Sequence, residues 1–108
     1  MAIEVIIRRT FQNQSQAAAL APLIIQLRSL AATQPGYITG QTLRCLDCDG
    51  EYLVISTWHC RQDWDNWFDN PARRNLQGQI DALLGEETRY RFYEPLVGGI
   101  VPDFSGSS

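Results

Sequence analysis

The sequence predicts a single α+β domain in which one antiparallel sheet carries its helices on one face, the ferredoxin-like arrangement. The first observation is the order of hydrophobic periodicities, which reads β-α-β-β-α-β along the chain. The second is size, because 108 residues, 44% of them hydrophobic and 19% charged, can bury one core but not two. No internal repeat interrupts this order.

A strand and a long helix come first. Residues 2–10 alternate between two sets of side chains, as a strand does. From residue 16 to about residue 33 the apolar side chains recur at the 3.6-residue spacing of a helix, which we expect Ser15 to cap. Pro22 lies inside this helix and predicts a kink or irregular first turns, and Pro35-Gly36 marks its end.

A hairpin follows the helix. Residues 37–47 and 51–59 read as two strands, and Asp49-Gly50 between them predicts a two-residue turn. Such a turn places Cys48 opposite Glu51. One face of the hairpin then carries Leu43, Cys45, Tyr52, Val54, Ser56 and Trp58. The other face carries Ile38, Thr42, Arg44, Leu46, Leu53, Ile55, Thr57 and His59.

The remaining elements are a short helix, a longer helix and a last strand. Residues 61–68 place three aromatic side chains on one helical face. Asn70-Pro71 is typical of an N-cap followed by proline in the first turn, and we expect the second helix to end at Gly85. Its apolar face comprises Leu76, Ile80, Leu83 and Leu84. Residues 87–96 alternate again, with Tyr90 and Phe92 on one side and Tyr93 on the other.

Both faces of the predicted sheet carry large apolar side chains. Helices can cover one face only, and a soluble monomer leaves few such side chains exposed on the other. We therefore expect two sheets to pack face to face in a homodimer. The alternative is an ordinary scatter of hydrophobic residues on the surface of a monomer.

The charge of the chain limits its partners. Twelve acidic residues and nine basic residues, all of them arginine, give a net charge of -3. Because a nucleic-acid-binding domain needs a basic patch, we expect no nucleic acid partner. The chain has no apolar stretch of the roughly 18 residues that a membrane span requires and no secretory signal, so we expect a cytoplasmic protein with no membrane partner.

The three cysteines give a weak metal signal. Cys45 and Cys48 have CxxC spacing, and His59-Cys60 follows. If Cys45 lies in an extended strand, three residues span about 10 Å, which exceeds the roughly 7 Å limit for a disulfide. We therefore expect free, half-buried thiols and no metal site.

Several segments together resemble a known family. They are Pro35-Gly36-Tyr37, the stretch from Ser56 to Trp64 (STWHCRQDW), Trp67-Phe68, and Asn70-Pro71-Ala72-Arg73. These segments resemble the antibiotic biosynthesis monooxygenase domain, over about residues 2–96. We therefore expect a domain at residues 1–97 and a tail at residues 98–108, from which Ile100, Val101 and Phe104 could dock.

The resemblance implies a dimeric α+β barrel with a pocket between the sheet and the helices of each protomer. Quinone-forming members insert oxygen into an electron-rich phenol or quinol without flavin, haem or metal. The deprotonated substrate itself reduces oxygen, so the protein supplies a dry pocket and groups that hold the anion. For this chain the resemblance therefore implies a small aromatic substrate and no cofactor.

Three tryptophans match pocket positions of the family. Trp58 corresponds to the tryptophan that ends the third strand and is the first candidate for a catalytic role. Trp64 lies where an aromatic residue recurs on the next helix, and Trp67 matches another position that lines the pocket. The alternative for all three is that they fill the core, as aromatic residues at helical spacing usually do.

The polar candidates are less specific. His59 is the one imidazole and a general-base candidate by its ordinary pKa, although alternation points it away from Trp58, toward the expected dimer face. Arg73 as a catalytic residue and Arg74 as a substrate-binding residue could each reach an oxyanion, or both could be solvated helix charges. Tyr37, a candidate substrate-binding residue, could line the pocket mouth or only begin a strand.

Other functions on the same fold stay open. An isomerase or decarboxylase would turn over without oxygen, and a stress-response or ligand-binding domain would have no chemistry. Haem-degrading members of the family ligate iron through a histidine on the second helix. Residues 73–78 (RRNLQG) contain no histidine, and an asparagine expected on the first strand is also missing, so the resemblance disfavours haem degradation.

Overall fold

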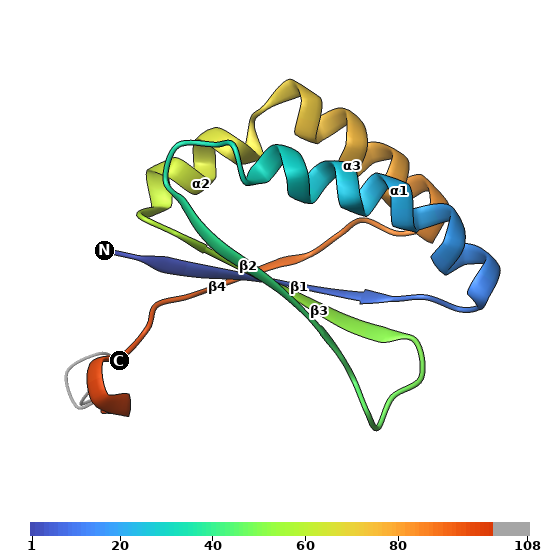
Figure 1. Cartoon of the computed structure of the whole chain (residues 1–108), viewed down its shortest axis with the longest axis horizontal. Coiled ribbons are helices and arrows are strands. Elements are labelled where there is room, and N and C mark those ends of the chain that lie inside the picture. The colour runs from blue at the N-terminus through green and yellow to red at the C-terminus, as the bar shows by residue number, and fades with distance from the viewer. Residues whose placement is uncertain (101–108) are drawn as a thin grey trace.

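In residues 1–100, which the computed structural model describes, four antiparallel strands form one sheet in the order β2-β3-β1-β4 (Figure 1). The three α-helices of this part of the chain pack over one face. The elements are β1 (Ile3–Thr10), α1 (Gln14–Ala31), β2 (Tyr37–Arg44), β3 (Glu51–Trp58), α2 (Arg61–Phe68), α3 (Pro71–Leu84), β4 (Tyr90–Tyr93) and a 3-10 turn, η1 (Val97–Gly99). This order confirms the predicted ferredoxin-like α+β fold.

The first helix begins earlier than its periodicity predicts. α1 starts at Gln14, and the side-chain oxygen of Asn13 accepts a hydrogen bond from the Gln16 N–H at 2.8 Å. The prediction that Ser15 caps this helix is wrong, because Asn13 has the extended backbone and the free oxygen that an N-cap needs. Pro22 does not divide α1, since both Pro22 and the region around Ala18, whose carbonyl it leaves unpaired, are exposed to water.

The second and third helices follow the sequence signals closely. α2 spans the predicted residues, and Asn70 caps α3 by accepting from the N–H groups of Ala72 and Arg73 at 2.9 and 3.2 Å. Gly85 ends α3 in the left-handed conformation, with φ of 76°. The buried face of α3 includes Ile80, as predicted, but Leu83 is exposed, and the other buried residues are Arg73 and Gln77.

The tip of the β2–β3 hairpin is wider than Asp49-Gly50 predicts. β2 ends at Arg44, and the Cys45 N–H donates to the Glu51 carbonyl at 2.9 Å. Residues 46–50 therefore form the loop, and the predicted two-residue turn is wrong.

This wider loop changes the pairing of the two strands. Thr42 lies opposite Val54, and Leu43 lies opposite Leu53. An odd shift in register turns every side chain of a strand to the other face, so the predicted partners of β2 are exchanged. Thr42 and Arg44 share the helix-covered face, whereas Leu43 shares the open face with Leu53.

The core lies between the sheet and the helices. Val5, Trp58, Trp64 and Trp67 form one buried cluster, with Trp58 fully buried. Leu20 of α1 and Ile80 of α3 are also fully buried. Tyr90 and Phe92 lie on one side of β4, as predicted, and this is the helix-covered side because they pair with Ile7 and Val5.

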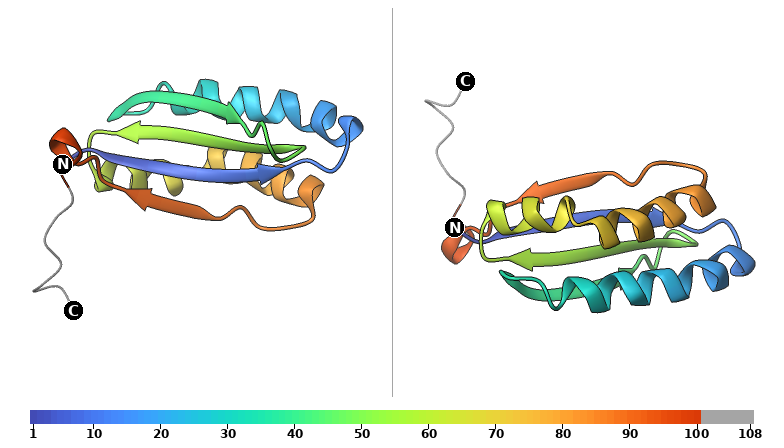
Figure 2. Two further views of the ribbon diagram at one scale, coloured as in Figure 1. Left: turned by 90° about the horizontal axis from the view of Figure 1, so that it is seen from below. Right: turned by 90° about the horizontal axis from the view of Figure 1, so that it is seen from above.

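The opposite face of the sheet is open in the single chain (Figure 2). Its exposed or half-buried apolar side chains come from all four strands and include Ile6, Leu43, Leu53, Ile55 and Tyr93. The last strand is shorter than predicted, and η1 lies beside the N-terminus. Most of the predicted tail, including Val101 and Phe104, lies outside the described residues.

Candidate functional site

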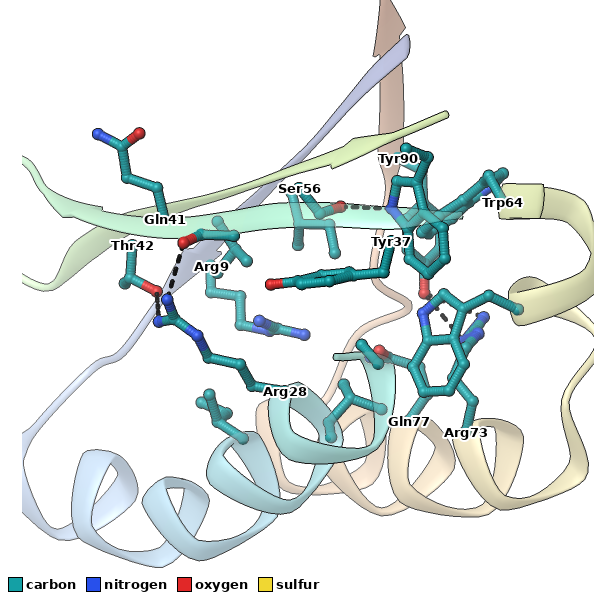
Figure 3. A pocket seen from close by; sticks show the side chains of 18 residues that line it. Arg9, Arg28, Tyr37, Gln41, Thr42, Ser56, Trp64, Arg73, Gln77 and Tyr90 are labelled. Atoms are coloured by element: carbon teal, nitrogen blue, oxygen red, sulfur yellow. Dashed lines mark hydrogen bonds between the residues drawn. The ribbon is translucent and has the colours of Figure 1, made fainter. Parts of the chain in front are cut away.

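A cavity opens between the sheet and the helices (Figure 3). The cavity has a volume of about 70 Å³. Its exposed lining residues, Arg28, Gln41 and Thr42, mark a mouth between α1 and β2. The complete lining is Ile7, Arg9, Ile24, Leu27, Arg28, Ala31, Tyr37, Gly40, Gln41, Thr42, Val54, Ser56, Trp58, Trp64, Trp67, Arg73, Gln77 and Tyr90.

Aromatic rings form the inner wall of this cavity. The Trp58 ring stands edge-on to Tyr37 and Trp64, with centroids 5.4 and 5.8 Å away, and stacks on Trp67 at 6.3 Å. The Trp58 indole N–H donates to the Ser56 hydroxyl at 3.0 Å. These contacts fix the ring orientations and present flat, apolar surfaces to whatever enters the cavity.

Beside this wall, the backbone of Gly36, immediately before β2, packs closely against Asp63 of α2. Gly36 has φ of 84°, and its carbonyl accepts from the His59 N–H at 2.7 Å, which ties the start of β2 to the end of β3. A side chain at this position would collide with Asp63 of α2. Glycine therefore lets Tyr37 and Trp58 meet beside the first turn of α2.

Arg73 and Tyr90 form a polar pair at the inner end of the cavity. Arg73, which is 4% exposed, donates through Nη1 and Nη2 to the Tyr90 hydroxyl at 3.5 and 3.3 Å, and through Nε to the Phe68 carbonyl at 3.1 Å. Burial raises the pKa of Tyr90, and the Arg73 charge only partly opposes this effect. Tyr90 is therefore a neutral hydrogen-bond donor near neutral pH.

Arg9 lies in the same space without a partner. It is 3% exposed, and its Nε and Nη2 atoms have no hydrogen-bond partner among residues 1–100. Burial lowers the pKa of Arg9, with partial compensation from Tyr90 and Asp81. A guanidinium nevertheless stays protonated in proteins, so this is a buried positive charge.

The cavity is positively charged in an acidic chain. Three of its 18 lining residues are arginines, Arg9, Arg28 and Arg73, and none is aspartate, glutamate or histidine. The whole chain has a net charge of -3. The cavity thus combines aromatic walls with a positive potential, which suits an aromatic anion.

The structure brings five of the seven predicted site residues together. Tyr37, Trp58, Trp64, Trp67 and Arg73 all line the cavity. His59 and Arg74 do not. His59 is exposed just after the end of β3, and Arg74 is exposed on α3. Neither is placed to touch a molecule in the cavity, so we assign them no role there.

Sequence reasoning missed several polar residues of the cavity, among them Arg9, Arg28, Gln77 and Tyr90. For Arg9 a signal existed, because alternation places it on the same face as Val5 and Ile7, where a charge is unusual. Gln77 lies one helical turn after Arg73. For Arg28 no signal existed, since its bond to the Gly40 carbonyl (2.8 Å) depends on tertiary packing.

The cysteine pair differs from its prediction. Ligand atoms of Cys45, Cys48 and Glu51 all lie within 4.8 Å of one another, at the hairpin tip. The prediction that Cys45 lies in an extended strand is wrong, because β2 ends at Arg44 and the chain turns back. These ligand atoms are close enough to approach one metal ion, and a hydrogen bond with Cys45 raises the pKa of the Cys48 thiol.

The sequence also matches a known protein family. The family described as antibiotic biosynthesis monooxygenase matches residues 2–79, which is more than two thirds of the 108 residues. The chain belongs to the antibiotic biosynthesis monooxygenase family. The predicted resemblance is therefore confirmed. No curated protein matches the sequence.

Solved structures share the fold of this family member. SnoaB, a cofactor-independent oxygenase from Streptomyces nogalater, superposes with a TM-score of 0.76 at 18% identity, covering 94% of this chain and 98% of that one. Rv0793 from Mycobacterium tuberculosis gives 0.75 at 20% identity, with 89% and 96% covered. A putative antibiotic biosynthesis monooxygenase from Nitrosomonas europaea gives 0.76 at 11%, with 90% and 92% covered.

Within residues 1–100, none of the helices has the length and apolar character needed to cross a bilayer.

Proposed function

We propose that this chain is a cofactor-independent monooxygenase for a small, electron-rich aromatic molecule of the phenol or quinol type. The observation that carries the proposal is the cavity, where indole and phenol rings surround a space that also contains guanidinium groups. The family membership and the fold shared with SnoaB, itself a cofactor-independent oxygenase, support the same reaction class.

The lining residues favour a mechanism in which the protein stabilises the substrate anion. No carboxylate or imidazole lines the cavity, so the lining contains no ordinary general base. Positive charge close to a phenol lowers the pKa of that phenol, so the arginines increase the anionic fraction at neutral pH. Arg73 and the neutral hydroxyl of Tyr90 are the donors best placed to hold the phenolate oxygen.

The electrons for the reaction come from the substrate. The phenolate transfers one electron to O2, and the resulting radical and superoxide combine at a ring carbon to form a peroxide. Loss of water from the peroxide leaves a quinone, so one oxygen atom enters the product and the other becomes water. The chain's part is to hold the anion among Trp58, Tyr37 and Trp67 and to exclude bulk water.

The open face of the sheet supports a homodimer as the working form. Ile6 and Ile55 lie directly opposite each other on the two central strands, and Leu43, Leu53 and Tyr93 surround them. A patch of this kind, on a face that no helix covers, is typical of an interface.

Oxygen uptake tests the reaction class. Metal-free, flavin-free protein would be mixed with a panel of 1-naphthols and hydroquinones in an oxygen electrode. We expect uptake above the rate of spontaneous oxidation for at least one phenol with a free ring position. Substrate turnover that continues at the same rate under nitrogen would instead indicate an isomerase or decarboxylase. Ligand-induced thermal stabilisation without any product would indicate a binding protein.

A further inference from the structure

The strongest unexplained feature of the cavity is the unpartnered guanidinium of Arg9. The other two cavity arginines have acceptors: Arg28 donates to the Gly40 carbonyl and Thr42 hydroxyl at 2.8 and 3.4 Å, and Arg73 donates to Phe68 and Tyr90. Arg9 has none for Nε and Nη2 within residues 1–100. A buried charge without a partner is costly, so its persistence needs a compensating anion.

The acidic side chain whose charge acts on Arg9, Asp81, does not supply that anion. The charge of Asp81 raises the pKa of Arg9 and so partly opposes the effect of burial. Its Oδ1 atom accepts from Gln77 Nε2 at 2.9 Å, Thr88 N at 3.2 Å and Thr88 Oγ1 at 2.6 Å. The ion pairs found in the described residues, Arg8 with Glu51 and Arg61 with Asp65, also leave Arg9 out.

The side chain is directed toward the lined space. Val5, Ile7 and Arg9 alternate on the helix-covered face of β1, and Figure 3 shows Arg9 reaching from the sheet toward the region beneath Tyr37. Nε and Nη2 lie on one edge of the guanidinium plane. Two parallel N–H bonds on one edge match the two oxygens of a carboxylate.

We infer that the aromatic ligand of this cavity carries a carboxylate, and that Arg9 binds this group through its Nε–Nη2 edge. The inference rests on the proposed function. It narrows the class of aromatic substrate from phenols in general to phenolic acids. Arg73 and Tyr90 remain free to hold the phenolate oxygen. The carboxylate would fix the orientation of the ring relative to the Trp58 wall.

Binding measured without oxygen tests the inference separately from catalysis. The probes are 2,5-dihydroxybenzoate and its neutral analogue 2,5-dihydroxybenzamide, titrated under nitrogen in a calorimeter. We expect the wild-type chain to bind the acid at least tenfold more tightly than the amide. Equal affinity, or binding of neither, would overturn the inference. Acetate is the third probe. Binding of acetate as tight as that of the aromatic acid would also overturn the inference.

Arg9→Gln locates the site. Because Nε and Nη2 of Arg9 have no partner to lose, we expect this variant to fold with a Tm at or above that of the wild type. Its affinity for the acid should fall at least tenfold, while its affinity for the amide should change less than threefold. Arg8→Gln is the matched control, since Arg8 is the next residue on β1, faces the open side and is exposed. Equal losses in both variants would contradict the assignment to Arg9.

Phenolic-acid binding and oxygenation can fail independently. If the acid binds through Arg9 but neither the acid nor any phenol of the panel consumes oxygen, the proposed function is wrong and the inference stands. If neutral phenols are oxygenated as fast as acids and Arg9→Gln has no effect on binding, the proposed function stands and the inference is wrong.

Discussion

At the scale of single residues, Trp58 holds the cavity wall together. Its fully buried ring contacts Tyr37, Trp64 and Trp67, and its N–H orients the Ser56 hydroxyl. Because misplacement of a bound substrate by about 1 Å can cost a factor of about 100 in rate, the wall affects turnover without entering the chemistry.

Trp58→Phe removes the N–H and part of this wall. We expect turnover to fall by a factor of about 10 to 100, and the free energy of unfolding to fall by about 1–3 kcal/mol, less than for a complete truncation. Steady-state oxygen uptake and urea unfolding measure the two effects. Tyr52→Phe is the control, since Tyr52 lies on the same strand but outside the cavity. Unchanged turnover in Trp58→Phe would exclude the proposed wall.

Tyr90 carries a pH prediction. Burial raises its pKa, so the folded chain keeps a proton that the unfolded chain loses above about pH 10. The free energy of unfolding therefore falls as pH rises above about 10, and this loss should be smaller in Tyr90→Phe. Ultraviolet titration of both proteins isolates the phenol of Tyr90 as the difference between the curves. A midpoint below 10 in that difference would contradict the buried Arg73–Tyr90 pair.

The residues that line the cavity could be predicted where local sequence rules or the family resemblance place them. They could be predicted less well where tertiary contacts determine their role. Trp58, Trp64 and Trp67 were expected at the cavity because the resemblance supplies their positions. Arg9 was not, although strand alternation places it inward. Its importance depends on the absence of a partner, and partners come from residues distant in the sequence.

At the scale of elements, the contact between the starts of β2 and α2 positions the aromatic wall. Gly36 occupies the left-handed region and lies against Asp63, whereas Gly85 has a similar φ of 76° and open space around it. A side chain at Gly85 would incur only the cost of the left-handed backbone conformation, whereas a side chain at Gly36 would also collide with Asp63.

Alanine at each glycine gives different expected costs. Gly85→Ala should lower the free energy of unfolding by about 1 kcal/mol, the cost of the conformation alone. Gly36→Ala should lower it by more than about 2 kcal/mol, because Asp63 and α2 must also move. Urea unfolding of the two variants gives the comparison. Equal losses would mean that α2 gives way freely and does not fix Tyr37.

The elements themselves were largely predictable. Asn70-Pro71 and Gly85 mark the ends of α3 because capping depends on a few neighbouring residues. The hairpin was mispredicted because Asp49-Gly50 is a local signal, whereas pairing of Leu43 with Leu53 extends across both strands. Cys45 was misplaced relative to Cys48 because β2 ends at Arg44, before both cysteines.

At the scale of the whole molecule, the open face predicts the state of assembly. Ile55→Arg places a charge at the centre of the apolar patch, and we expect it to convert a dimer into a folded monomer. Analytical ultracentrifugation measures the mass, and circular dichroism verifies the fold. Gln26→Arg, at an exposed position of α1, should leave the dimer intact. A wild-type chain that sediments as a monomer at tens of micromolar would contradict the dimer.

In the proposed reaction the chain inserts one atom of oxygen into an aromatic substrate without a cofactor. The most direct test is the stoichiometry of the reaction with metal-free, flavin-free protein and the phenol that gives the fastest uptake. We expect one O2 consumed for each quinone formed, with no hydrogen peroxide and no oxygen returned when catalase is added. Simple oxidation of the substrate would release peroxide, and catalase would return half of the oxygen. That result would contradict a monooxygenase reaction.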